Sequence, residues 1–295
     1  MTTFNAMRSL VAKWLIISLA LLALGACSAV RLGYNNGPTL ALWWLDGWLD
    51  LDAAQEARAR ADIERWFAWH RATQLPDYAG LLQQWQARAG ADVTGAEVCA
   101  WTEQVRQRFW TGLEAALPMA AAALPDLTEP QWQHLQRRQA ERLAQAREDY
   151  LQPRREDRLA AALERAVERA EDFYGPLLPA QRDLLAAATA ASPLAPESWL
   201  AQREARQRTL VQALREAQRL PDPARRLAAL RVAADAYGRR PPGAEGERQA
   251  RWQAHNCETA ARLHASATPA QREHLRDRLA AWEEDLRALA AAGAP

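Results

Sequence analysis

A cysteine near the start of the chain has the surroundings of a residue that becomes acylated. Leu24, Gly25 and Ala26 precede Cys27 and form a lipobox, the site where a bacterial secreted protein is cleaved. Gly25 and Ala26 are small enough for a peptidase that must fit the backbone into a narrow cleft. The Cys27 thiol can then take a diacylglycerol. The spacing therefore predicts Cys27 as a lipidation site.

The residues before Cys27 have the organisation of a secretory signal. Arg8 and Lys13 supply positive charge, and an apolar run from Trp14 to Leu24 follows them. This run is shorter than the ~20 apolar residues that span a bilayer. Residues 1–26 are therefore predicted to be a lipoprotein signal peptide. An ordinary cleaved signal with a coincidental cysteine and an uncleaved N-terminal anchor are the two alternatives.

The residue after Cys27 bears on the destination of the protein. It is Ser28, and by analogy with lipoprotein sorting a non-acidic residue there permits export to the outer membrane. One acyl chain anchors a protein only marginally, whereas the three expected on such a cysteine anchor it firmly. We expect palmitate at Cys27 and a protein held on the periplasmic face of the outer membrane.

The composition defines the fold class. Formal net charge is +1, with basic and acidic residues interspersed, so no nucleic-acid partner is expected. Ala, Leu, Arg, Glu and Gln dominate the chain, and all are strong helix formers. The prediction is an all-α protein, a multi-helix bundle or an extended array of roughly ten helices.

The order of segments predicts the domain organisation. Residues 27–38 contain Tyr34, Asn35, Asn36, Gly37 and Pro38 and are expected to be a lipidated tether or turn. Residues 39–295 are expected to form an all-helical periplasmic domain, with a subdivision near 118–127. We expect a helix to start at Pro76, and Pro118 to interrupt the helical pattern, because proline breaks helix interiors.

One helix-start signal recurs. Thr128 is an N-cap whose Gln131 can reach back to it, and Asp52 with Gln55 has the same arrangement. Gln181 and Gln271 follow related starts at Pro179 and Pro269. The separations are unequal, so both repeated use of good capping chemistry and internal duplication remain open.

Tryptophans concentrate in the first half of the chain. Trp43, Trp44 and Trp48 lie on a short apolar helix about a dozen residues from Cys27. Tryptophan favours the headgroup region of membranes, which makes an interfacial belt one interpretation. The favoured interpretation is a hydrophobic core, where large aromatic residues at helical spacing usually pack.

Two further cysteines, Cys99 and Cys257, allow two interpretations. An oxidising compartment permits a disulfide between them. Closing so long a loop is worth on the order of 4–5 kcal/mol in the chain-entropy description. The other interpretation is two separate buried thiols.

Motifs for catalysis or metal binding are missing from the sequence. No two of His70, His134, His255, His264 and His274 are four residues apart, and no HExxH or CxxC is present. A zinc site is therefore not predicted. There is also no phosphate loop and no GxSxG. We expect no enzymatic activity, no metal and no cofactor.

Several segments spread along the chain carry a resemblance to a known family. They are Leu24-Gly25-Ala26-Cys27, Arg31-Leu32-Gly33-Tyr34-Asn35-Asn36, Trp43-Trp44-Leu45, Asp50-Leu51-Asp52 with Gln55, Trp69-His70-Arg71, Leu75-Pro76-Asp77-Tyr78 and Thr268-Pro269-Ala270-Gln271. With these segments the chain resembles the family of proteobacterial lipoproteins called domain of unknown function 6279 (DUF6279), and the resemblance covers essentially its whole length. It implies an all-helical lipoprotein without an established activity.

A second resemblance concerns one motif. Leu127-Thr128-Glu129-Pro130-Gln131 is similar to the LTxxQ repeat of the Spy/CpxP family of periplasmic chaperones and stress sensors. The main expectation is a binding or structural module of the cell envelope, tethered by lipid and contacting an envelope protein. The alternative is a chaperone or stress sensor of the Spy/CpxP kind. The sequence does not specify an oligomeric state.

Overall fold

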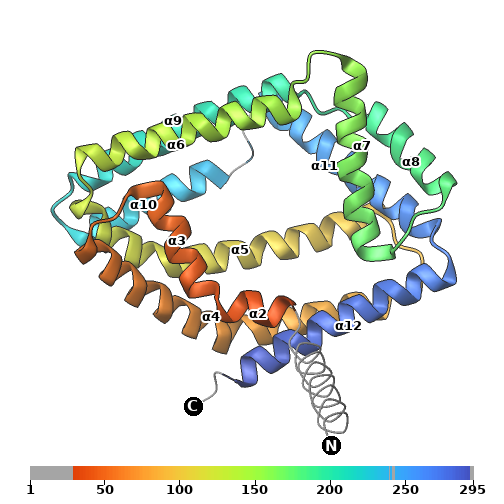
Figure 1. Ribbon diagram of the computed structural model, residues 1–295, viewed down its shortest axis with the longest axis horizontal. Helices are drawn as coiled ribbons and strands as arrows, with labels where there is room; N and C mark the ends of the chain where they lie inside the picture. Colours follow the sequence, from red (N-terminus) through yellow and green to blue (C-terminus); the bar gives the residue numbers. More distant parts are fainter. Residues whose placement is uncertain (1–28, 239, 241–242, 293–295) are drawn as a thin grey trace, which may run out of the picture.

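A computed structural model describes residues 29–238, 240 and 243–292 (Figure 1). These residues form eleven α-helices and one 3-10 helix, with no strand among them, which confirms the all-α prediction. The helices are α2 (Ala29–Asn35), α3 (Gly37–Leu49), α4 (Ala53–Arg88), α5 (Gly95–Ala123), η1 (Leu124–Asp126), α6 (Glu129–Tyr150), α7 (Arg155–Tyr174), α8 (Pro179–Ala190), α9 (Pro196–Gln218), α10 (Pro223–Gly238), α11 (Gly243–Ala265) and α12 (Pro269–Ala291).

The helices form a frame-like array rather than a parallel bundle (Figure 1). One edge is made by α6 and α9, which pack side by side, and the opposite edge by α4 and α12. Helix α5 packs against α10 and α11 between these edges, while α7 and α8 close one end. Of the two architectures expected, a bundle or an extended helical array, the structure shows the helical array.

Among the described residues, buried apolar side chains form three clusters, and further buried leucines such as Leu75, Leu279 and Leu289 lie outside them. Trp132 is 2% exposed in the first cluster, which joins α5, α6, α9 and α10. Leu177 and Leu263 belong to the second, where α7, α8 and α11 meet. Leu200 packs on α6 in the third. Because each cluster is small, contacts other than apolar burial must help to fix the frame.

The prediction that Pro76 and Pro118 would mark helix boundaries is wrong. Pro76 lies inside α4 and Pro118 inside α5. A proline within a helix leaves the carbonyl four residues earlier without its usual partner. Those carbonyls belong to Ala72 and Glu114, which are exposed, as are both prolines. Water can therefore hydrate the freed groups, and both helices continue.

The expectation of a tether or turn at residues 27–38 is corrected for its described part, residues 29–38. Residues 29–35 form α2, and α3 begins at Gly37. Gly37 lies so close to the Phe67 ring that an added Cβ would be 2.5 Å from it. Of the turn residues seen in the sequence, only Asn36 lies between the two helices; the others belong to the end of α2 or the start of α3.

A disulfide connects two of the central helices. Cys99 on α5 and Cys257 on α11 are joined with a Cα–Cα distance of 5.5 Å and a sequence separation of 158. Cys257 is 4% exposed. The bond joins two segments far apart in the chain along the line where α5 and α11 pack.

Replacing both cysteines by serine should lower the free energy of unfolding, by up to on the order of 4–5 kcal/mol, because the unfolded chain regains the freedom that a long loop had lost. Urea unfolding of the C99S/C257S protein and of the wild type measures the difference. Wild-type protein unfolded in a reducing buffer serves as the control and should show the same loss. Equal stability of the oxidised, reduced and substituted proteins would contradict this prediction.

Candidate functional site

Of the three cysteines that the sequence singled out, Cys27 lies outside the residues that the structure describes. The described chain starts at Ala29, where α2 begins, two residues further on. Cys99 and Cys257 are brought together, as given above.

A pair of glutamines joins the N-termini of α4 and α6; we call it the first glutamine junction. Gln55 Oε1 accepts the Asp52 N–H at 3.1 Å, and Gln131 Oε1 accepts the Thr128 N–H at 2.9 Å. Each side chain therefore caps its own helix. The two amides also face each other, since Gln131 Nε2 donates to Gln55 Oε1 at 2.5 Å. Both glutamines are buried.

A second pair joins α8 and α12 in the same way; this is the second glutamine junction. Gln181 Oε1 accepts the Leu178 N–H at 2.9 Å, and Gln271 Oε1 accepts the Thr268 N–H at 3.0 Å. Gln181 Nε2 donates to Gln271 Oε1 at 2.8 Å. Leu178 has no side-chain oxygen, so the cap at this helix comes from Gln181 alone.

The two junctions share a further detail. In each junction, Nε2 of each glutamine also donates to a backbone carbonyl that lies two residues before the N-cap of the partner helix. The four acceptors are the carbonyls of Asp126, Asp50, Ser266 and Pro176. Every glutamine thus satisfies one donor of its own helix and one acceptor of another chain segment. The sequence predicted the caps but not their pairing, since pairing depends on how distant helices meet.

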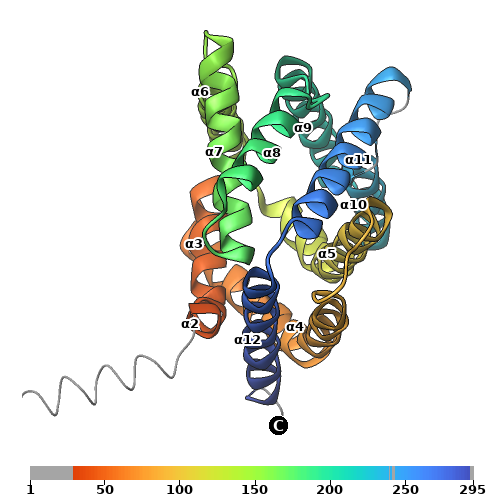
Figure 2. The same ribbon diagram turned by 90° about the vertical axis from the view of Figure 1, so that its right-hand side faces the viewer.

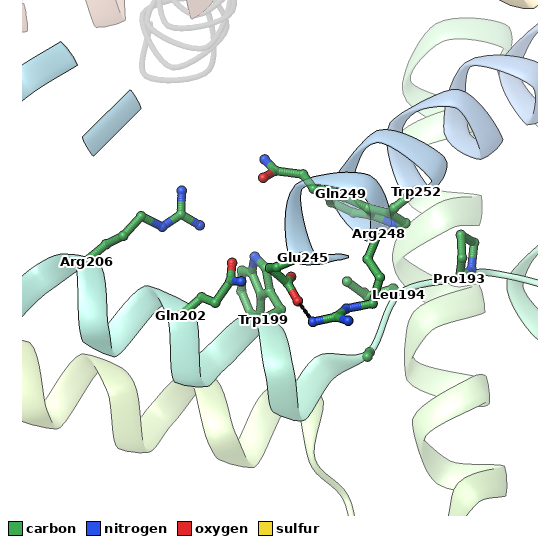
Figure 3. Close-up of a pocket in the computed structure, with 10 residues that line it drawn as sticks. Pro193, Leu194, Trp199, Gln202, Arg206, Glu245, Arg248, Gln249 and Trp252 are labelled. Atoms are coloured by element: carbon green, nitrogen blue, oxygen red, sulfur yellow. Dashed lines mark hydrogen bonds and ion pairs between the residues drawn. The ribbon is translucent and has the colours of Figure 1, made fainter. Parts of the chain in front are cut away.

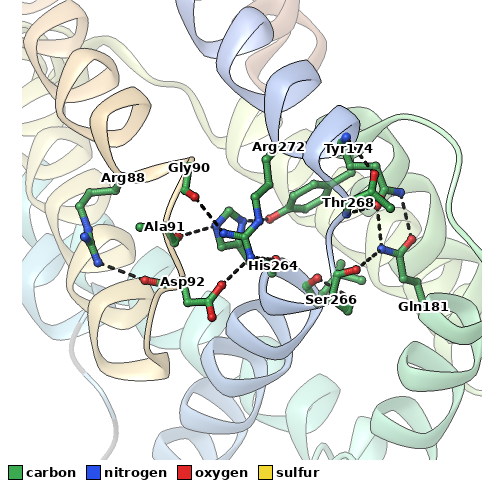
Figure 4. Close-up of polar contacts among 12 residues, drawn as sticks. Arg88, Gly90, Ala91, Asp92, Tyr174, Gln181, His264, Ser266, Thr268 and Arg272 are labelled. Carbon is green, nitrogen blue, oxygen red and sulfur yellow. Dashed lines mark hydrogen bonds and ion pairs between the residues drawn. The ribbon is translucent and has the colours of Figure 1, made fainter.

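His264 lies beside the second junction and ties three segments together (Figure 4). Its Nε2 is 2.9 Å from the Ala91 carbonyl oxygen, and because a carbonyl can only accept, Nε2 carries the proton. Nδ1 then accepts from the Tyr174 hydroxyl at 2.9 Å. Arg272 donates to the Gly90 carbonyl at 3.1 Å and forms an ion pair with Asp92. This cluster fixes the α4–α5 loop against α7, α11 and α12.

Burial sets the protonation of this cluster. It lowers the pKa of His264 below 6.5, and it raises the pKa of Tyr174 to about 12. The neutral imidazole and the neutral phenol are therefore the forms that the folded protein favours.

A second histidine, His70, joins α2 to α4. The Tyr34 hydroxyl is 2.9 Å from His70 Nδ1, and the Tyr78 hydroxyl is 3.3 Å from Nε2. Arg71 Nη2 donates to Asn35 Oδ1 at 2.9 Å. Desolvation by burial lowers the pKa of His70 as well. These contacts hold α2 against the body.

A pocket between the start of α9 and α11 is small (Figure 3). Trp199 and Trp252 line it together with Glu245 and Arg248, which form an ion pair. Its volume is about 40 Å³, whereas ligand pockets usually measure about 300–1,000 Å³. Ser198 Oγ donates to Glu245 at 2.9 Å, so the carboxylate already has protein partners.

The remaining histidines make contacts between helices or lie apart. His255 Nε2 is 2.9 Å from the Ala188 carbonyl, and His134 Nε2 is 3.2 Å from that of Gly47. Within the described residues, no group of three or more His, Cys, Asp or Glu side chains could hold a metal ion. None of the helices described is both long and apolar enough to cross a membrane.

The favoured interpretation of the first tryptophans as core residues is wrong for two of them. Trp43 is 75% exposed and Trp44 59% exposed, whereas Leu42 on the same helix is buried. Trp48 is half-buried and packs against Trp44 with ring centroids 5.9 Å apart. Helix α3 therefore buries Leu42 and exposes Trp43 and Trp44.

Comparison with known proteins gave one match. Residues 47–234 match the sequence model of a family described as "Family of unknown function (DUF6279)". No curated protein and no solved structure matched the chain.

Gln181→Ala and Gln271→Ala should each lower the free energy of unfolding by about 1–3 kcal/mol, since each leaves buried backbone groups without a partner. The double variant should lose less than the sum, because the first change already breaks the shared hydrogen bonds. Urea unfolding measures all three. Gln133→Ala, at an exposed position on α6, is the matched control and should change stability by less than about 0.5 kcal/mol. Strict additivity would count against paired glutamines.

Stability should fall as the pH drops from 7.5 to 5.5. The unfolded chain takes up protons on its histidines near pH 6.5, before the folded protein does, because burial lowers the pKa of His264 and His70. The contribution is thus complete above the unfolded pKa and is lost as the pH falls through the folded one. In His264→Gln this loss should be smaller, as measured by urea unfolding at both pH values. Identical pH slopes for variant and wild type would disprove the role of His264.

Proposed function

The chain belongs to the DUF6279 family of unknown function, and from that premise we propose that it is a lipid-anchored lipoprotein of the bacterial outer membrane. Its helical body faces the periplasm and acts as a binding or structural module of the cell envelope. We propose two partners. One is the membrane, which the protein reaches through lipid on Cys27, and the other is an envelope protein bound by the helical frame.

The lipobox is the observation that carries this proposal. Leu24-Gly25-Ala26-Cys27 follows a short basic segment and an apolar run in the order that a lipoprotein signal requires. Ser28 after Cys27 supports the outer membrane as the destination.

The disulfide supports an extracytoplasmic location. Disulfides persist in oxidising compartments such as the periplasm and are rare in the cytosol, and Cys99 and Cys257 form one here.

The construction of the body supports a binding or structural role. Its polar clusters, the two glutamine junctions and those around His70 and His264, use their hydrogen bonds to join helices. The pocket beside Trp199 and Trp252 is too small for a typical substrate. A frame fixed in this way can present long helical surfaces, such as the edge formed by α6 and α9, to a partner.

A second candidate function is that of a chaperone or stress sensor related to the Spy/CpxP family. The helix start from Leu127 to Gln131 supports it through its LTxxQ pattern. Exposed apolar side chains on α5, Val105 and Phe109, offer contacts for an unfolded client. Suppression of client aggregation by the purified protein, absent with an inert protein at equal concentration, would favour this candidate over the structural module.

Cys27→Ala should abolish lipid attachment, because the acyl chains are carried by that residue. Cells grown with radiolabelled palmitate should show label on the wild-type protein and none on the variant. C99S/C257S, which removes the two cysteines of the disulfide and leaves Cys27 in place, is the control and should keep the label.

Two results would contradict the lipid anchor. One is a wild-type protein that takes up no palmitate. The other is a purified protein whose N-terminus is intact and begins at Met1.

A further inference from the structure

Helices α2 and α3 present a set of uncovered apolar side chains that we call the α2–α3 apolar face. It consists of Leu32, Leu40, Trp43 and Trp44, which are 62%, 54%, 75% and 59% exposed. Exposed tryptophans are costly in water, and neighbouring exposed apolar residues mark interaction surfaces more often than chance. We therefore expect a binding partner to cover this face.

The spacing of the residues on α3 places them on one side of that helix. Leu40, Trp43 and Trp44 are three and four residues apart, so they lie on one side of α3. Leu42 lies on the other side and is 4% exposed. A helix face in water normally carries charged groups, yet no charged residue occurs from Leu32 to Leu45. The exposed side of α3 is thus the more aromatic one, opposite to the usual pattern of a surface helix.

The face is fixed relative to the body. Arg31 on α2 donates to Asp285 on α12 at 2.7 Å, and this carboxylate is buried. Tyr34 and Asn35 contact His70 and Arg71 on α4, as described above. Helix α3 also packs on α4 and α6. In Figure 2, α2 and α3 lie along one edge of the molecule. The apolar side chains therefore point away from a rigid support.

The face is close in sequence to the proposed anchor. Helix α2 begins two residues after Cys27. With a rise of about 1.5 Å per helical residue, Leu32 lies within about one turn of the start of α2, and Trp44 about 23 Å along the helical path. Lipid on Cys27 would hold α2, and with it this face, near the bilayer.

We infer that the α2–α3 apolar face docks on the lipid surface of the membrane that carries the anchor. The inference rests on the proposed lipidation of Cys27. Tryptophan prefers the headgroup region, and leucine enters the adjoining hydrocarbon, so the residue types match that boundary. The contact would orient the body on the membrane, because α2 and α3 are part of the frame. The opposite side of the body then faces the periplasm.

Quenching by brominated lipid tests this docking directly. Full-length protein purified from membranes is reconstituted into vesicles of phosphatidylethanolamine and phosphatidylglycerol, with and without bromine on the acyl chains. Brominated lipid should lower the tryptophan emission of the wild type. W43F/W44F, which keeps apolar rings at both positions, should lose most of that quenching. W252F, with its substitution in α11, is the matched control and should retain it.

Three further measurements accompany the quenching experiment: peptide mass, circular dichroism and light scattering. The mass of the N-terminal peptide reports lipidation, so an unlipidated protein overturns the proposed function, and the inference falls with it. A lipidated protein whose quenching is absent, or unchanged in W43F/W44F, overturns the docking inference alone. Circular dichroism should show that the variant folds like the wild type. Light scattering in detergent would overturn the inference in favour of a second copy if W43S/W44S converted a dimer into a monomer.

Discussion

The buried pairing of glutamine side chains is the constraint on which the frame depends. A helix start leaves backbone N–H groups without partners, and burying such groups is costly unless they are hydrogen-bonded. At Gln55 and Gln131, and again at Gln181 and Gln271, one amide caps its own helix and binds the opposite segment. Glutamate could accept these bonds but could not donate, and two carboxylates would then face each other. Only a neutral group that both donates and accepts satisfies this geometry.

This constraint explains how a protein with small, separate apolar clusters keeps one shape. Trp132 follows Gln131 directly and anchors the first cluster, and its indole donates to Gln218 on α9 at 2.9 Å. Leu263, in the second cluster, precedes His264, which bonds to Tyr174 and Ala91. Polar contacts thus lie next to apolar clusters at these two places, and the disulfide between Cys99 and Cys257 joins α5 to α11.

The sequence predicted those features of the fold that depend on residues close together in the chain. The capping pairs of Asp52 with Gln55 and Thr128 with Gln131 lie where their spacing indicates, because both partners belong to one turn. The effect of Pro76 was not predictable in this way, since it depends on which side of α4 faces solvent. The exposure of Trp43 depends on which side of α3 finds a partner.

The contacts that join the ends of distant helices also could not be predicted from the sequence. Gln181 and Gln271 meet only because α8 and α12 converge, and no local pattern encodes that meeting. For the same reason the residues from Ala29 to Asn35 looked like a tether: their partners, His70 and Asp285, are far away in the chain.

The central claim is that α2 and α3 are rigid parts of the frame, so that an anchor at the N-terminus orients the whole body. Hydrogen–deuterium exchange of the intact protein, read by mass spectrometry on peptides covering 29–49, tests it most directly. The account predicts that these amides exchange slowly, like those of α4. Exchange as fast as that of an unstructured peptide would show a free tether and would contradict it.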